Sequence, residues 1–162
     1  MSLINHRRRS ARWHGASQKV RQSAAPLFLD RIDIQCEISP VPFQDISKAA
    51  PGEPSAKIRE RVIKAREVQA ERFNDYKGIH CNAQMTERMI HQFAEPDEQG
   101  IKLLRMAMEK LSLSARAYNR ILKVARTIAD LAGSEQIKPY HIAEAVGYGT
   151  LDRGDWAERG HL

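Results

Sequence analysis

The sequence has little of several features that mark common classes of protein. Of its 162 residues two are cysteine and 6% are aromatic, and no apolar run approaches the ~20 residues that a membrane-spanning helix needs. Cys36 and Cys81 have no CxxC or HxxxH pattern near them, so they indicate neither a disulfide framework nor a metal site. We expect reduced thiols in a cytoplasmic protein. No apolar segment follows the basic N-terminus, which argues against a secretory signal peptide.

The excess of positive charge belongs to one short stretch. The formal net charge is +6, and residues 1–24 contain six basic side chains and no acidic one. The other residues carry equal numbers of basic and acidic side chains, so the charge does not indicate a nucleic-acid surface on the folded part. Residues 1–25 are predicted to be a basic, disordered arm. The alternative is an arm that binds phosphates, with Trp13 stacking on a base.

The most regular amphipathic stretch runs from Leu111 to Leu131. Its apolar residues recur at helical spacing and predict one buried face: Tyr118, Ile121, Leu122, Ala125, Ile128, Ala129 and Ala132. Ser114 is expected to cap the N-terminus of this helix and Gly133 to end it. Arg116 lies in the first turn, where the helix dipole disfavours a cation unless a carboxylate or a phosphate lies opposite. A solvated arginine is the alternative.

A strand and a linker are predicted upstream of the helices. Residues 32–38 alternate between apolar and polar side chains, as in a strand with one apolar face. Pro40 and Pro42 end this pattern, and residues 39–54 contain four prolines. Arg31 directly precedes the strand, where a local ion pair with Asp30 is one interpretation. Residues 26–54 are therefore predicted to be a strand followed by a Pro-rich linker.

Residues 55–148 are predicted to fold as a small helical bundle, so the fold class is mainly α. The first helix begins at Ser55, with its buried stripe expected at Ile58, Val62, Ala65, Gln69 and Phe73. Further helices are expected from Thr86, from Pro96 and, after the central helix, from Pro139 to Gly147. The loop that contains His80, Cys81 and Asn82 lacks a second histidine or acid at useful spacing, so a catalytic Cys–His pair is not indicated. Residues 149–162 are predicted to be a tail.

Two runs of residues closely resemble a known family. Residues 26–34, PLFLDRIDI, are similar to a PLLDRIDI motif, and LSAR with VARTIADL in residues 113–131 resembles the second-sensor helix in the lid of magnesium-chelatase-like AAA+ ATPases. Within that family the ComM group is the most similar, and the resemblance covers residues 26–158. It implies that residues 55–148 are the lid domain. It also implies that Arg31 is an arginine finger acting on a neighbour's nucleotide, and that Arg116 reaches the terminal phosphates of ATP.

The resemblance further implies ATP and Mg²⁺ as cofactors of a full-length parent, neighbouring subunits in a hexameric ring, and remodelling of branched DNA, with no membrane partner. In the parent fold the strand would lie in a parallel sheet. A magnesium chelatase motor subunit is the alternative within the family, and a free-standing helical interaction module is the alternative outside it. The family usually has an arginine after the residue matching Tyr148, where this chain has Gly149.

One further absence bears on activity. The sequence contains no GxxxxGK[ST] motif and no apolar strand ending in paired acids. A phosphate cradle and a magnesium ligand are both needed to hydrolyse ATP. We therefore expect the C-terminal piece of a larger ATPase, inactive alone, with no tightly bound cofactor and no metal ligands of its own. Without its neighbouring strands, the predicted strand is expected to fold back on the helices or to pair with a second copy.

Overall fold

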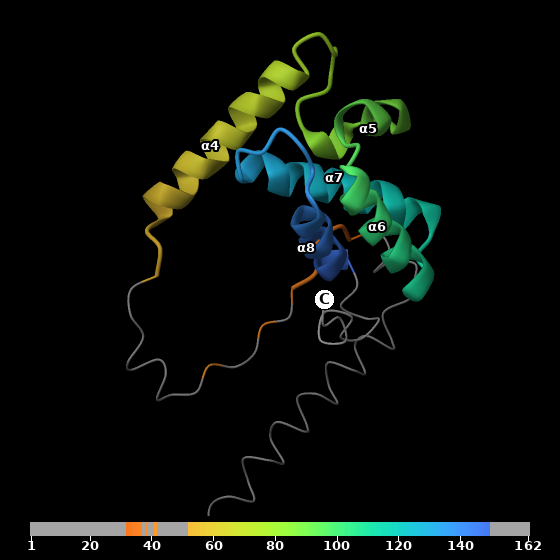
Figure 1. The fold of residues 1–162 in the computed structure, drawn as a ribbon. Coiled ribbons are helices and arrows are strands. Elements are labelled where there is room, and N and C mark those ends of the chain that lie inside the picture. The colour runs from red at the N-terminus through yellow and green to blue at the C-terminus, as the bar shows by residue number, and fades with distance from the viewer. Residues whose placement is uncertain (1–31, 37, 39–40, 42–51, 150–162) are drawn as a thin grey trace, which may run out of the picture. The chain divides into compact units, whose positions relative to one another are not determined.

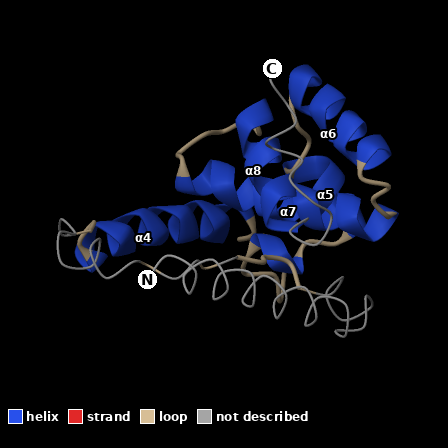
Figure 2. Ribbon diagram, turned by 90° about the horizontal axis from the view of Figure 1, so that it is seen from below, coloured by secondary structure: helices blue, strands red, loops and turns tan. Residues whose placement is uncertain are grey.

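The computed structural model describes residues 32–36, 38, 41 and 52–149. The predicted arm of residues 1–25, Arg31 and the tail residues 150–162 lie outside these ranges. Every described element is a helix or a loop (Figures 1 and 2), and the helices belong to one compact unit that begins at Asp33. The elements are α4 (Ser55–Arg72), the short 3₁₀ helix η1 (Asn82–Gln84), α5 (Glu87–Phe93), α6 (Glu98–Lys110), α7 (Ala115–Leu131) and α8 (Pro139–Gly149). The predicted mainly α bundle is confirmed.

Local side-chain chemistry explains where the helices begin and end. The Ser114 hydroxyl accepts from the Ala117 N–H at 3.2 Å and caps α7 as predicted. At the other end, Gly133 has φ +66°, and the Ser134 N–H donates to the Ala129 carbonyl at 2.8 Å, which is the Schellman arrangement. Thr86 and Asp97 cap α5 and α6 in the same way as Ser114. Caps and stops thus fix these boundaries from residues that the sequence displays.

The core is built around α7. This helix packs against α8, α4, α5 and η1, and α8 also packs against α6. The buried core consists of Phe73, Met85, Met89, Ile90, Ala94, Leu104, Ala107, Ile121, Leu122, Ala125, Ala129, Ile137, Ile142, Ala145 and Val146. A parallel bridge between Pro96 and Ile137 joins the segments that lead into α6 and α8. A Cβ on Gly100 would lie 2.9 Å from the Pro96 Cβ, so a glycine permits this close approach.

The predicted strand is not present among its described residues. Residues 32–36 and 38 are in loop conformation, and the Gln35 N–H donates to the Tyr148 carbonyl at 2.9 Å. Ile34 and Ile38 are 54% and 90% exposed. A strand needs a neighbour to satisfy its backbone groups, and the described residues supply none. The segment instead contacts the end of α8, a helix that extends two residues beyond the Gly147 expected from the sequence.

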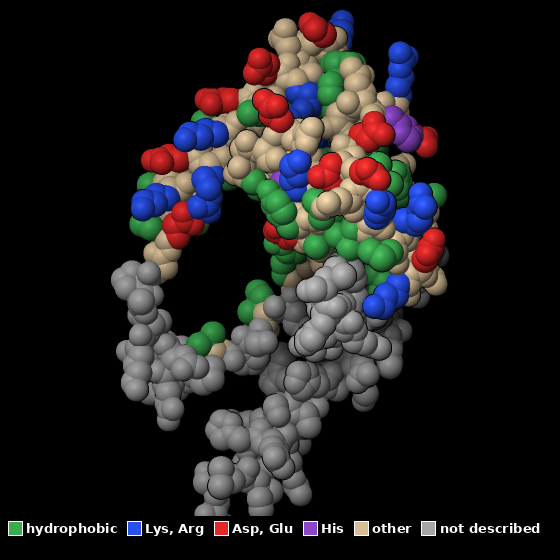
Figure 3. All heavy atoms as spheres, in the orientation of Figure 1, with side chains coloured by type: hydrophobic (Ala, Val, Ile, Leu, Met, Phe, Trp, Pro, Cys, Tyr) green, Lys and Arg blue, Asp and Glu red, His purple; other side chains and the backbone are tan. Residues whose placement is uncertain are grey.

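The predicted buried stripe of α4 is correct for only half of the helix. Ala65, Gln69 and Phe73 are buried, but Ile58 and Val62 are 43% and 45% exposed. Figure 1 shows the reason, because the N-terminal half of α4 extends past the other helices. Its surface carries charges of both signs, interspersed (Figure 3). None of the described helices is both long and apolar enough to cross a membrane.

Candidate functional site

Arg116 lies in the first turn of α7 at the surface of the bundle. The turn before α7 is tight: Ser112 has φ 48°, and the Leu113 N–H donates to the Met108 carbonyl at 3.0 Å, which ends α6 and turns the chain into α7. The Arg116 side chain is exposed, and among the described residues it has no hydrogen-bond or ion-pair partner. Arg31, the predicted finger, lies outside the described residues.

The other cations of α7 are all engaged with the protein backbone. Arg120 donates from Nη2 to the Gly149 carbonyl at 3.3 Å, and Lys123 donates from Nζ to the Ala83 carbonyl at 2.9 Å. Arg126 donates to the carbonyls of Glu135 and Ser134 at 2.7 and 2.6 Å, just beyond the end of the helix. These three side chains hold α7 against neighbouring segments through hydrogen bonds, whereas Arg116 makes no such bond within the described residues.

Gly149 also contacts a cation of α7. A Cβ built on Gly149 would lie 3.2 Å from the Arg120 Nη2, so even a small side chain would require the guanidinium to shift. The backbone at this position therefore serves as an acceptor for a cation of α7.

A buried polar cluster lies at the opposite end of α7 from Arg116. The side chain of Asp130 is 0% exposed. Arg72 of α4 binds it through two hydrogen bonds, of 2.7 and 2.6 Å, in the bidentate geometry that gives strong charge-assisted bonds. Arg126, one turn earlier on α7, donates from Nε at 3.0 Å. The Asn82 amide of η1 donates at 2.8 Å.

The remaining polar groups of this cluster are paired as well. The Asn82 amide nitrogen also contacts the Thr127 hydroxyl at 3.1 Å, and the Asn82 carbonyl oxygen accepts from Arg72 at 2.8 Å. The Asn82 backbone N–H donates to the Gln69 side chain of α4 at 3.2 Å. Burial acts to raise the pKa of Asp130, but hydrogen bonds from Arg72 and Asn82, with the nearby guanidinium charges, outweigh burial and lower the pKa. The carboxylate is thus held ionised.

Sequence reasoning missed this cluster, although a signal for part of it was present. Arg126 and Asp130 are spaced i,i+4 on the stripe of α7 that also carries the buried Leu122 and Ala129. Charged residues on an apolar stripe indicate either a buried pair or an error in the predicted face. Nothing in the local pattern of α4 identified Arg72 as the partner, because α4 contains many arginines.

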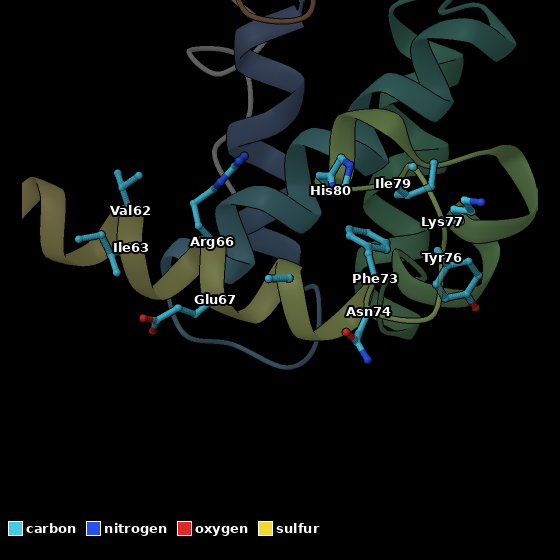
Figure 4. Close-up of a pocket in the computed structure, with 12 residues that line it drawn as sticks. Val62, Ile63, Arg66, Glu67, Phe73, Asn74, Tyr76, Lys77, Ile79 and His80 are labelled. Atoms are coloured by element: carbon cyan, nitrogen blue, oxygen red, sulfur yellow. The ribbon is translucent and has the colours of Figure 1, made fainter.

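A surface groove lies between α4 and the loop that follows it (Figure 4). Its volume is about 770 Å³, and its lining mixes apolar residues such as Val62 and Tyr76 with charged ones such as Arg66 and Glu67. Arg116 does not line it. Within the described part of the chain, no group of three or more His, Cys, Asp or Glu residues could hold a metal ion.

The described helices form a small helical bundle of the lid type, built on a capped helix whose first turn presents an exposed arginine. The family model described as magnesium chelatase, subunit ChlI C-terminal, matches residues 52–149. The chain belongs to this family, as the resemblance predicted. The matched region contains all of the helices α4 to α8 and the polar cluster around Asp130.

Individual relatives agree with this assignment. The chain is 42% identical over 127 residues to "Competence protein ComM" of Haemophilus influenzae, covering 78% of this chain and 24% of that protein. "Uncharacterized protein YifB" of Escherichia coli gives the same identity and coverage. "Uncharacterized protein Rv2897c" of Mycobacterium tuberculosis is 32% identical over 121 residues, covering 75% of this chain and 24% of that protein. The chain thus spans about a quarter of the length of the relatives it matches.

Proposed function

We propose that this chain is the lid region of a ComM-like AAA+ ATPase and that Arg116 binds the terminal phosphates of ATP held by the same subunit. The observation that carries the proposal is the contrast along α7. Three of its cations donate to backbone carbonyls, while Arg116 has no partner among the described residues. An anion at this place would also meet the positive end of the α7 dipole.

The residues present fit a nucleotide phosphate but not its metal ion. The guanidinium of Arg116 offers several N–H donors in a planar fork that suits phosphate oxygens. The described part of the chain has no acidic cluster for Mg²⁺, so the metal would be held elsewhere in a longer protein. When bound, Mg²⁺ supplies charge neutralisation at the β- and γ-phosphates. Arg116 alone offers about one charge-assisted contact of ~1.5–3 kcal/mol, so this chain by itself should bind ATP weakly and hydrolyse none.

The remaining parts of the proposal concern the assembly. Arg31 acts as an arginine finger on nucleotide bound by a neighbouring subunit of a hexameric ring, where such a residue accelerates phosphoryl transfer by ~10³–10⁵. The ring couples ATP hydrolysis to remodelling of DNA. The name of the Haemophilus relative, a competence protein, favours a role in DNA handling.

The direct test is Arg116→Ala in a full-length protein that carries this chain. Loss of one charge-assisted phosphate contact should lower kcat/KM for ATP by roughly 10- to 100-fold. Arg105→Ala is the matched control, because Arg105 is an exposed arginine of α6, and it should leave the rate unchanged. Equal rates for Arg116→Ala and the unaltered protein would overturn the assignment.

Arg31 is tested separately, because it acts across an interface. Subunits with Arg31→Ala, mixed with subunits that lack a cradle lysine, should recover part of the activity, since some interfaces then join an intact cradle to an intact finger. No recovery at any mixing ratio, with assembly confirmed, would contradict the role of Arg31.

The motor subunit of a magnesium chelatase is the second candidate. The description of the matching family model favours it, because that model is named after a chelatase subunit. A gene neighbourhood rich in tetrapyrrole synthesis would select this function. Stimulation of the ATPase by branched DNA, and not by a porphyrin, would select the first.

A further inference from the structure

Helix α4 is attached to the bundle through a small part of its surface. Of its 18 residues only Ala65 and Gln69 are buried, and both lie in its C-terminal half. Ile58, Val62 and Ile63 in the other half are 43–49% exposed. Helix α7 is the helix against which α4 packs most closely. The position of α4 therefore depends on a short joint with α7 and η1.

Polar contacts form one part of that joint. Arg72, in the last turn of α4, binds Asp130 and Asn82, and Gln69 accepts from the Asn82 backbone. The apolar contribution at this end of α4 comes from Ala65 and from Phe73, which follows the helix. Apolar packing tolerates small sliding movements, whereas a bidentate Arg–carboxylate pair fixes both distance and orientation.

Asp130 connects α7 and the segment that follows it with α4. Through Arg126 it is tied to its own helix, and Arg126 in turn holds the backbone of Ser134 and Glu135 after α7. Through Arg72 it is tied to α4. Without the carboxylate, two guanidinium groups would face one another in a buried site with no countercharge.

Arg116 and Asp130 lie at opposite ends of the same helix. At 1.5 Å per residue they are about 20 Å apart along the axis. Helix α7 contains no proline or glycine, and no kink is indicated. A displacement of its first turn would therefore move its last turn as well.

We propose that Asp130 is a positioning residue that couples the helix carrying Arg116 to α4, so that movement of α7 is passed through the Arg72–Asp130 pair to α4 and to the segment that enters it. The coupling itself stands on the geometry of this chain, and its use in an ATPase cycle rests on the proposed function. Asp130 touches no nucleotide in this scheme. It acts on the reaction through Arg116 and α4.

The first test uses this chain alone and follows amide hydrogen exchange. Asp130→Asn removes the charge at almost constant shape. Residues 65–72 of α4 should then exchange roughly tenfold faster or more, while α6 and α8 keep their protection. The matched control is Glu98→Gln, because Glu98 forms an exposed i,i+4 pair with Lys102, and it should change nothing. Unaltered exchange in α4 would overturn the proposal, and so would a uniform loss of protection in all helices.

A second variant distinguishes release of α4 from misfolding of the whole chain. Arg72→Met removes the α4 side of the joint and leaves the Arg126–Asp130 pair of α7 intact. It should release α4 as Asp130→Asn does, with an unchanged near-ultraviolet spectrum for the bundle. Arg72→Lys should restore part of the protection, because a lysine keeps the charge but not the bidentate geometry. Equal exchange rates of α4 in Arg72→Met and Arg72→Lys would contradict a positioning role.

The functional test separates this proposal from the one on which it rests. In a full-length protein, Arg72→Met should lower kcat for ATP hydrolysis with little change in KM, because Arg116 still reaches the phosphates. Arg116→Ala should lower kcat/KM. If Arg116→Ala has no effect, the proposed function fails. If Arg116→Ala acts as expected but Arg72→Met leaves kcat unaltered, only the coupling through Asp130 fails.

Discussion

The two arginines Arg116 and Arg126 show how position decides what a charged side chain does. Both belong to α7, but Arg126 is buried with its donors satisfied, and Arg116 is exposed. Breaking a buried ion pair leaves a charge without compensation and typically costs 3–5 kcal/mol, whereas an exposed side chain with no partner contributes little. The same residue type thus serves stability at one end of the helix and is available for binding at the other.

This contrast predicts opposite outcomes for two alanine variants of the isolated chain. Arg126→Ala should lower the free energy of unfolding by about 1–3 kcal/mol, because the carbonyls of Ser134 and Glu135 lose their donor while Arg72 still pairs with Asp130. Arg116→Ala should change it by less than about 0.5 kcal/mol. Urea titrations followed by circular dichroism measure both. A large loss of stability in Arg116→Ala would show that Arg116 is a structural residue, against the proposed phosphate contact.

His141 is a buried titratable group that the proposed function does not use. It is 0% exposed, and its Nδ1 accepts from the Lys138 N–H at 3.0 Å, the reciprocal bond of a capping box at the start of α8. Its Nε2 has no hydrogen-bond partner within the described residues. Burial, together with the charges of Arg126 and Lys138, lowers the pKa of His141, and Glu144 and Asp97 oppose this only in part.

Acid should therefore destabilise the fold through His141. The unfolded chain takes up this proton as the pH falls below about 6.5, while the folded chain resists it because His141 is buried near the charge of Arg126. The contribution of neutral His141 to the free energy of unfolding is fully present above this pH. It decreases as the pH falls through the lowered pKa, with a slope of at most about 1.4 kcal/mol per pH unit.

His141→Gln should flatten this slope, because glutamine can accept from Lys138 but does not titrate. His91→Gln, at an exposed site on α5, is the control and should leave the slope unaltered. Unfolding free energies measured by urea between pH 7.5 and pH 5, values chosen to bracket about 6.5, make the comparison. An unchanged slope in His141→Gln would exclude this histidine as the source of acid sensitivity.

Among the elements, α7 is followed by Gly133 and α8 contains Gly147. Replacing these two glycines should change the stability in opposite directions. Gly133 ends α7 with φ +66°, and the left-handed region costs other residues ~1–2 kcal/mol. Gly147 lies within α8, and a Cβ there would meet no atom within 4 Å. Alanine is favoured over glycine inside a helix by roughly 0.8–1 kcal/mol.

Gly133→Ala is therefore expected to destabilise the chain and Gly147→Ala to stabilise it. Thermal unfolding should move in opposite directions for the two variants, each by several degrees in a domain of this size. A shift of both in the same direction would mean that the conformation at one of these ends is not the one described.

The elements also show how far sequence reasoning reaches. Helix starts at Ser114 and Pro139 and the stop at Gly133 were predicted correctly, because caps act over three or four residues. Exposure of Ile58 and Val62 could not be foreseen, since periodicity shows which residues share a face but not whether another helix covers that face. The role of Arg72 depends on Asp130, a residue far along the chain, and no local pattern contains that information. Arg116 was identified through resemblance, and its lack of a partner within the described residues required the structure.

At the scale of the whole molecule, the helices should fold without the residues that precede them. Among the described upstream residues, Ile32 and Gln35 are half-buried and none is buried, and the buried core lies between Phe73 and Val146. A chain beginning at Glu53 should keep the helical circular dichroism signal and melt within a few degrees of the full chain. Loss of the helical signal would mean that the upstream segment is part of the core, and that the boundary between residues 54 and 55 is misplaced.

The distance in sequence between Arg72 and Asp130 also has a consequence for synthesis of the protein. The two residues are 58 positions apart, and ribosomes add about 5–20 residues per second, so α4 emerges ~3–12 seconds before the carboxylate that fixes it. During that delay Arg72 lacks the carboxylate that it binds in the folded domain. The interspersed acidic and basic side chains of α4 (Figure 3) suit exposure to water, because a helix with a wide apolar face would invite aggregation or chaperone binding during the delay. Because its contacts with α7 include polar ones, α4 can remain exposed to water until Asp130 has been synthesised.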